Sequence, residues 1–129
     1  GRFRILMLHH PASPGLVSRR KALDDRAALL AVIARVGVDL VLHGHAHIPH
    51  FEEVMTPTGS APAIGGGSLS HPRGSSDKMP GRYNLLTLER RPDRFRLELE
   101  ARQYDPSSGG VASVEQRVYE RPTLSSETV

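Results

Sequence analysis

Residues 39–47, Asp-Leu-Val-Leu-His-Gly-His-Ala-His, combine a short apolar run with three histidines that follow it directly. An unbroken apolar run of this length, preceded by Gly37, is typical of a strand buried in a sheet. In an extended backbone alternate side chains point the same way, so we expect His45 and His47 to present two imidazoles on one side. Imidazole binds zinc, iron, nickel and manganese. This stretch therefore predicts a metal site at the end of a buried strand.

A second histidine window follows another apolar strand. Residues 3–8 end in Leu-Met-Leu and lead into His9-His10-Pro11, where proline stops the strand. Between the two windows, apolar residues recur at helical spacing over residues 20–36, with Gly37 past the end. A strand, helix, strand unit favours parallel pairing, and parallel strands present their carboxyl ends at one sheet edge. We therefore expect His9 to face His45 and His47.

The rest of the chain predicts further strands and loops. We expect strands at 51–55 and 63–64, a loop at 68–81, a hairpin formed by 83–89 and 94–102, and a last strand at 113–119 with Val114 and Val118 inward. Residues 120–129 should form a frayed tail.

Composition limits the chemistry. The chain of 129 residues has no cysteine, so a metal must be held by His, Asp, Glu or Asn. The net charge is +3, and the basic residues are dispersed, which argues against a nucleic-acid partner. No apolar run reaches the length of a membrane span, about 20 residues. We expect a soluble, cytoplasmic chain with one domain or part of one.

The two windows, Leu8-His9-His10-Pro11 and His43-Gly44-His45-Ala46-His47, resemble the last two motifs of the calcineurin-like metallophosphoesterases. The segment Gly81-Arg82-Tyr83-Asn84-Leu85 looks like the closing strands of the class III cyclic-nucleotide phosphodiesterase branch. The resemblance implies an α/β sandwich, with mixed sheets packed face to face and helices outside. Residues 1–129 would form its C-terminal half.

The resemblance also implies a dinuclear centre of Mn, Fe or Zn ions. By motif position, His9 and His45 would bind the second metal and His47 the first. His10 and His43 match positions that are not ligands, and would orient ligands, touch substrate or simply pack beside the site.

The family's earlier motifs, Asp-x-His, Gly-Asp-x-x-Asp and Gly-Asn-His-Asp/Glu, do not occur in this sequence. The chain thus contributes no catalytic residue and no bridging carboxylate, and by itself we expect it to be inactive. A fragment, which we favour, a split protein whose first half is another chain, and a degenerate binding domain would each explain this. In the first two cases, the upstream half of the domain is a partner of these residues.

The predicted function is hydrolysis of a phosphoester, with a cyclic nucleotide or another phosphodiester as substrate. Next to the glycine run at residues 65–67, Ser68, Ser70 and His71 are candidate substrate contacts, although such a run more often marks a tight turn. The alternatives are a non-catalytic interaction module of the same fold and a DNA-processing nuclease, whose affinity would fall steeply with salt.

Overall fold

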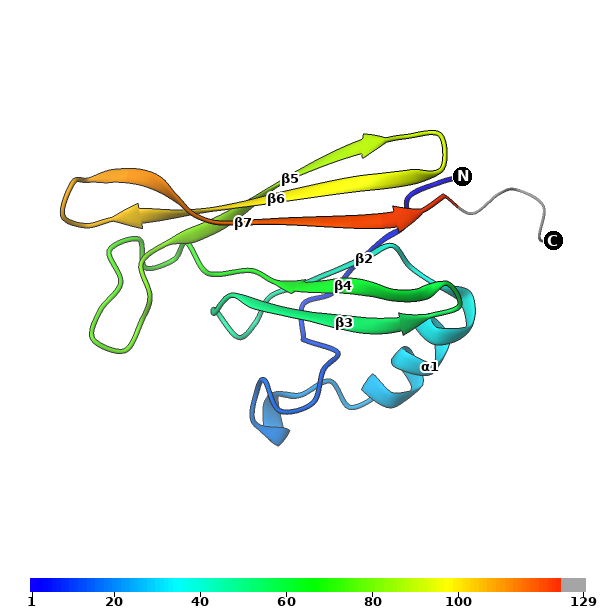
Figure 1. The fold of residues 1–129 in the computed structure, drawn as a ribbon. Coiled ribbons are helices and arrows are strands. Elements are labelled where there is room, and N and C mark those ends of the chain that lie inside the picture. Colours follow the sequence, from blue (N-terminus) through cyan, green and yellow to red (C-terminus); the bar gives the residue numbers. More distant parts are fainter. Residues whose placement is uncertain (124–129) are drawn as a thin grey trace. The chain divides into compact units, whose positions relative to one another are not determined.

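The computed structural model describes residues 1–123 (Figure 1). The chain divides into two compact units, Phe3–Gly65 and a unit made of Gly66 onward with Gly1–Arg2. The first unit contains β1 (Ile5–Met7), a short 3₁₀ turn at Arg19–Lys21, α1 (Arg26–Val36), β2 (Leu40–His43), β3 (His50–Thr56) and β4 (Gly59–Gly65). The second contains β5 (Arg82–Arg90), β6 (Arg94–Asp105) and β7 (Gly110–Pro122). The fold class is α/β, as predicted.

The first unit is built on a four-stranded sheet of order β1-β2-β4-β3. Strand β2 pairs in parallel with β1 and with β4, whereas β3 pairs antiparallel with β4. The Leu8 N–H extends the first pairing by donating to the Leu42 carbonyl at 2.8 Å. The predicted strand, helix, parallel strand unit is therefore confirmed, and the ends of β1 and β2 lie next to each other.

Helix α1 is shorter than the predicted range of 20–36, because residues 19–21 form a separate 3₁₀ turn and α1 begins only at Arg26. Its end at Val36 is as predicted. Gly37 has φ of 77°, a conformation that favours glycine, and its N–H donates to the Ile33 carbonyl at 2.8 Å.

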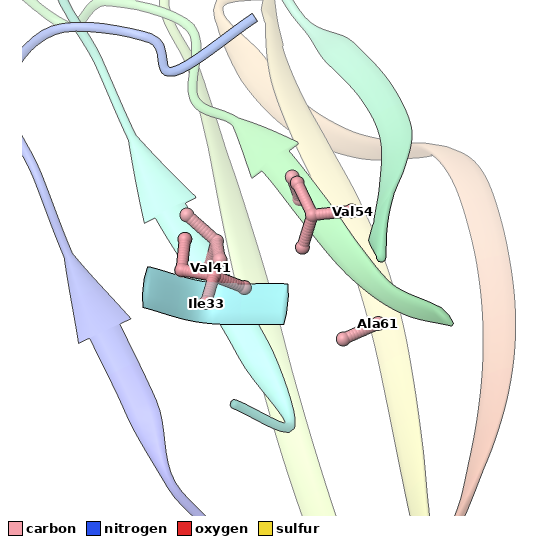
Figure 2. Close-up of a cluster of buried hydrophobic side chains, with 5 residues drawn as sticks. Ile33, Val41, Val54 and Ala61 are labelled. Carbon is pink, nitrogen blue, oxygen red and sulfur yellow. The ribbon is translucent and has the colours of Figure 1, made fainter. Parts of the chain in front are cut away.

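The core of this unit lies between α1 and one face of the sheet. Ile33, Val41, Val54, Ala61 and Ala63 are each at most 5% exposed and form one cluster, in which Figure 2 labels the first four. Burial of such side chains stabilises the unit by about 1.5–3 kcal/mol for each of the larger residues. Because Val41 faces the helix, the residue two positions later, His43, lies on the same face of the sheet.

The second unit is an antiparallel sheet of order β5-β6-β7. As predicted, apolar and polar side chains alternate along β6, and the apolar ones, Phe95, Leu97, Leu99 and Ala101, are buried. The hairpin turn lies between Arg90 and Arg94, also as predicted. Strand β7 is longer than predicted and extends through Glu120 to Pro122, into the predicted tail, whereas residues 124–129 lie outside the described part.

The predicted inward orientation of Val114 and Val118 is wrong, since the two side chains are 48% and 53% exposed. Val118 lies opposite Glu98, on the charged face of β6, so the strand register places it away from the apolar face. No helix among residues 1–123 is long and apolar enough to span a membrane.

Candidate metal centre

Three histidines from the two predicted windows converge in the first unit. The Nε2 atom of His9 lies 3.0 Å from Nδ1 of His45, although the residues are 36 positions apart. His10 completes the group, and one ligand nitrogen from each of the three residues lies within 4.8 Å of the others. The three rings are 4.4–4.9 Å apart between centroids. This spacing is short enough for one ion to contact all three residues.

The parallel pairing of β1 and β2 produces this convergence. Both windows leave the sheet at the same edge, and the Gly44 N–H donates to the His9 carbonyl at 3.1 Å, which ties the two segments together beyond the strands. The Ala46 N–H then donates to the Gly44 carbonyl at 2.8 Å in a tight bend. Backbone hydrogen bonds thus fix the relative position of His9 and His45.

The surroundings of His45 favour its neutral imidazole. The pKa of His45 is lowered, mainly by desolvation and further by charge repulsion from His10, His9, Lys21 and His47. Its Nε2 atom is buried and has no hydrogen-bond partner among residues 1–123. Metal ions bind the deprotonated ring, so a lowered pKa and an unsatisfied nitrogen both fit a metal ligand.

His47 lies outside this group. Its side chain is exposed, and φ is 64° at His45 and 60° at His47, so the segment bends instead of remaining extended. The expected alternation of His45 and His47 is therefore wrong as a description of the backbone. Whether His9, His45 and His47 bind metal stays a prediction, and His10 joins the group although its motif position is not that of a ligand.

The remaining predicted residues lie elsewhere. His43 is buried on the sheet face that carries the core. Ser68, Ser70 and His71 belong to the second unit, where the two serine Oγ atoms lie 2.6 Å apart and His71 Nε2 lies 3.1 Å from Lys78 Nζ. Their role as substrate contacts stays a prediction.

A pocket of about 220 Å³ lies beside the histidine group, and nothing in the sequence pattern indicates it. Its lining includes His45 together with Leu16, Val17 and Lys21. The lysine provides a positive charge close to the imidazoles, which suits an anionic ligand. The loop at residues 11–18 carries no motif, so only the folded arrangement identifies this pocket.

The donor set determines what the group can do. All three members are histidines, and no Asp or Glu of the described residues belongs to the group. Three neutral imidazoles suit a single zinc-class ion with an open coordination position. A bridged pair of ions requires a carboxylate that this group does not contain.

No family model and no curated protein matches the sequence. A solved structure with similarity is Vps29 from Chaetomium thermophilum, at 18% sequence identity and a TM-score of 0.41. The match covers 95% of this chain and 55% of Vps29, so the chain spans about half the length of that protein.

Proposed function

We propose that this chain binds a divalent transition metal ion through His9, His10 and His45. The observation that carries the proposal is the 3.0 Å approach of His9 to His45 from segments 36 residues apart, with the His10 nitrogen in the same group. When bound, the ion would supply Lewis acidity and an acidified water molecule. The three histidines would offer it their ring nitrogens, and Lys21 offers a charge to an anionic ligand in the adjacent pocket.

For this chain by itself, we propose a metal-binding module without catalysis. Among the described residues, the three-histidine group includes no carboxylate to bridge the two ions that two-metal phosphoester hydrolysis uses. The resemblance of the two histidine windows to metallophosphoesterase motifs supports a second candidate, in which another segment or chain completes a phosphodiesterase site. A cyclic nucleotide or a similar phosphodiester would then be the substrate.

Metal binding is tested by zinc titration of the EDTA-treated chain and by elemental analysis. We expect His45→Ala and His9→Ala to remove the ion that these residues bind, because each deletes one of three ligands. The matched control is His71→Ala, which removes an exposed histidine of the other unit. Unchanged zinc content in both His9→Ala and His45→Ala would refute the proposal.

A chromogenic phosphodiester and a cyclic nucleotide separate the two candidate functions. We expect the zinc- or manganese-loaded chain to show no turnover above that of free metal. Turnover that requires His45 and Lys21 would overturn the non-catalytic assignment and support a hydrolase. The Lys21→Met variant keeps the length of the side chain and removes only its charge.

A further inference from the structure

A second polar group lies at the end of the core face of the first sheet. Across the neighbouring strands β2, β4 and β3, His43 pairs with Gly65 and Gly65 pairs with His50. One step earlier, Val41 pairs with Ala63 and Ala63 with Glu52. Residues directly opposite each other share a face, so His43, His50 and Glu52 lie on the face that carries Val41. The apolar cluster under α1 thus ends in two imidazoles and a carboxylate.

Gly65 makes room for this arrangement. A Cβ atom at position 65 would lie 2.7 Å from Cε1 of His43 and 3.0 Å from Cβ of His50. Any side chain there would push the His43 ring away from the space between the two histidines. The absence of a side chain in the central strand therefore allows both rings to lie over the same point of the sheet, with centroids 6.1 Å apart.

The polar atoms of this group are buried without hydrogen bonds. Within residues 1–123, both ring nitrogens of His43, Nε2 of His50 and Oε1 of Glu52 lack a hydrogen-bond partner. His43 is only 6% exposed. Oε2 of Glu52 lies 3.4 Å from Nε2 of His50, but this contact does not satisfy the imidazole as a hydrogen bond. Buried polar atoms of native proteins are almost always paired with protein or with ordered water, so four such atoms together call for a bound partner.

The imidazole of His43 is buried, and a carboxylate belongs to the same group. Desolvated imidazoles together with a carboxylate are good donors for a divalent cation.

We propose that His43, His50 and Glu52 form a second binding site for a divalent transition metal ion of the zinc class. Two imidazoles and one carboxylate are a common ligand set for zinc. With Zn–N bonds of about 2.0–2.1 Å, two imidazoles on one ion have ring centres on the order of 5–6 Å apart, close to the separation seen here. The donor atoms are less tightly gathered than in the His9, His10 and His45 group, so binding requires a rotation of the partly exposed His50 ring.

The experiment is a titration of the EDTA-treated chain with Zn²⁺ against a chromogenic chelator. We expect the wild type to take up two ions, and His50→Ala and Glu52→Gln to take up one. Glu53→Gln is the matched control, because Glu53 is exposed on the opposite face of β3 and carries the same charge. We expect this variant to keep both ions. His45→Ala should keep only the ion at the second site.

The outcomes for the two sites are separable. If His50→Ala and Glu52→Gln bind as much zinc as the wild type, or if the wild type binds one ion that His45→Ala removes, the second site is refuted. If the wild type binds one ion that His45→Ala keeps and Glu52→Gln loses, the second site stands and the first fails. Glu52→Gln is nearly isosteric, so it tests the site if His50→Ala unfolds. Long-range ¹H–¹⁵N spectra should show zinc-dependent shifts of the His43 ring nitrogens that Glu52→Gln abolishes.

Discussion

His45 and His47 both hold their backbones in the left-handed region, with φ of 64° and 60°. Residues other than glycine, asparagine and aspartate rarely adopt this backbone conformation, which costs about 1–2 kcal/mol per residue. Such strain tends to persist where the surrounding structure positions functional groups. Here it turns His45 towards His9 and directs the segment away from the extended path that β2 would otherwise continue.

Replacing these two histidines by glycine should separate strain from ligation. In both His45→Gly and His47→Gly, relief of about 1–2 kcal/mol of left-handed strain outweighs about 0.5–1 kcal/mol of added chain entropy. We therefore expect metal-free His47→Gly to be as stable as the wild type or up to about 1.5 kcal/mol more stable in denaturant unfolding. His45→Gly should gain less, because it loses the contact between His9 and His45.

Zinc titration should then distinguish the two variants. His45→Gly should lose the ion of the three-histidine group, whereas His47→Gly should retain it, because His47 lies outside that group. Loss of this ion in His47→Gly as well would mean that His47 is also a ligand.

The candidate metal centre could be predicted in part from the sequence. The approach of His9 to His45 follows from two apolar strands that pair in parallel, and strand signals and connection rules are enough to predict it. The involvement of His10 and the exposure of His47 depend on φ angles in two bends, which residue types do not determine. The pocket beside His45 depends on how a loop without a motif folds back.

Among the elements, α1 has one buried side chain, Ile33, which is 2% exposed and packs on the core together with the partly buried Leu29 and Leu30. We expect Ile33→Ala to lower the free energy of unfolding by about 2–5 kcal/mol, because the cavity opens inside the cluster with Val41 and Val54. Val32→Ala on the same helix is the control, since Val32 is 44% exposed and its truncation should change stability by less than about 0.5 kcal/mol. Urea unfolding followed by circular dichroism measures both values.

Strands β5 and β7 are linked across β6 by the ion pair of Arg82 and Glu115, with Nη2 of Arg82 2.6 Å from Oε2 of Glu115. The hydrogen bond from Arg82 is the main cause that lowers the pKa of Glu115. A carboxyl group whose pKa is lowered in the folded state stabilises the protein at pH values above its ordinary, unfolded-state pKa. This contribution is lost as the pH falls through the folded-state pKa.

Glu115→Gln should therefore be less stable than the wild type at neutral pH by about 1–3 kcal/mol. The difference should shrink as the pH falls below the ordinary pKa of glutamate, about 4.3, and should disappear once the carboxyl of folded wild type is protonated at lower pH. Unfolding curves of both proteins between neutral and acidic pH test this. A difference that does not depend on pH would show that charge pairing is not its origin.

The elements could be predicted better than their boundaries and faces. Regular alternation in β6 identified a strand with one apolar face, and the turn at residues 91–93 set the hairpin. The sequence predicts too early a start for α1, because Leu23 continues the apolar spacing upstream of Arg26, whereas residues 19–21 form a separate 3₁₀ turn. The sequence predicts the wrong face for Val118, because valine is common on both faces of a strand and the register with β6 decides which face it occupies.

For the whole molecule, metal binding should couple to stability through protons. A ligand that binds only the folded chain raises the unfolding free energy by about 2.7 kcal/mol when its concentration is a hundred times its dissociation constant. Protons compete with zinc for imidazole, so this gain should disappear as the pH falls through the range in which histidine titrates. The pKa of His45 is lowered, so protons compete less with zinc for this ring. The part of the zinc-induced stabilisation that depends on His45 should therefore persist to lower pH than it would with a histidine of ordinary pKa.

Thermal unfolding with and without zinc, at neutral and at mildly acidic pH, measures this coupling. His45→Ala should reduce the zinc-induced rise in Tm, and Glu53→Gln should leave it unchanged. If zinc raises the Tm of the wild type and of His45→Ala equally, the three-histidine group does not cause the zinc-induced stabilisation.

Strand β1 has only three residues and stands at the end of the first sheet, with Ile5 52% and Met7 75% exposed. Along residues 1–123, no strand pairs with its outer side. An apolar edge of this kind offers unpaired backbone groups to any extended peptide, including other copies of the chain. At high concentration the protein should therefore self-associate through this edge, and Met7→Lys should delay the onset of light scattering without changing zinc uptake.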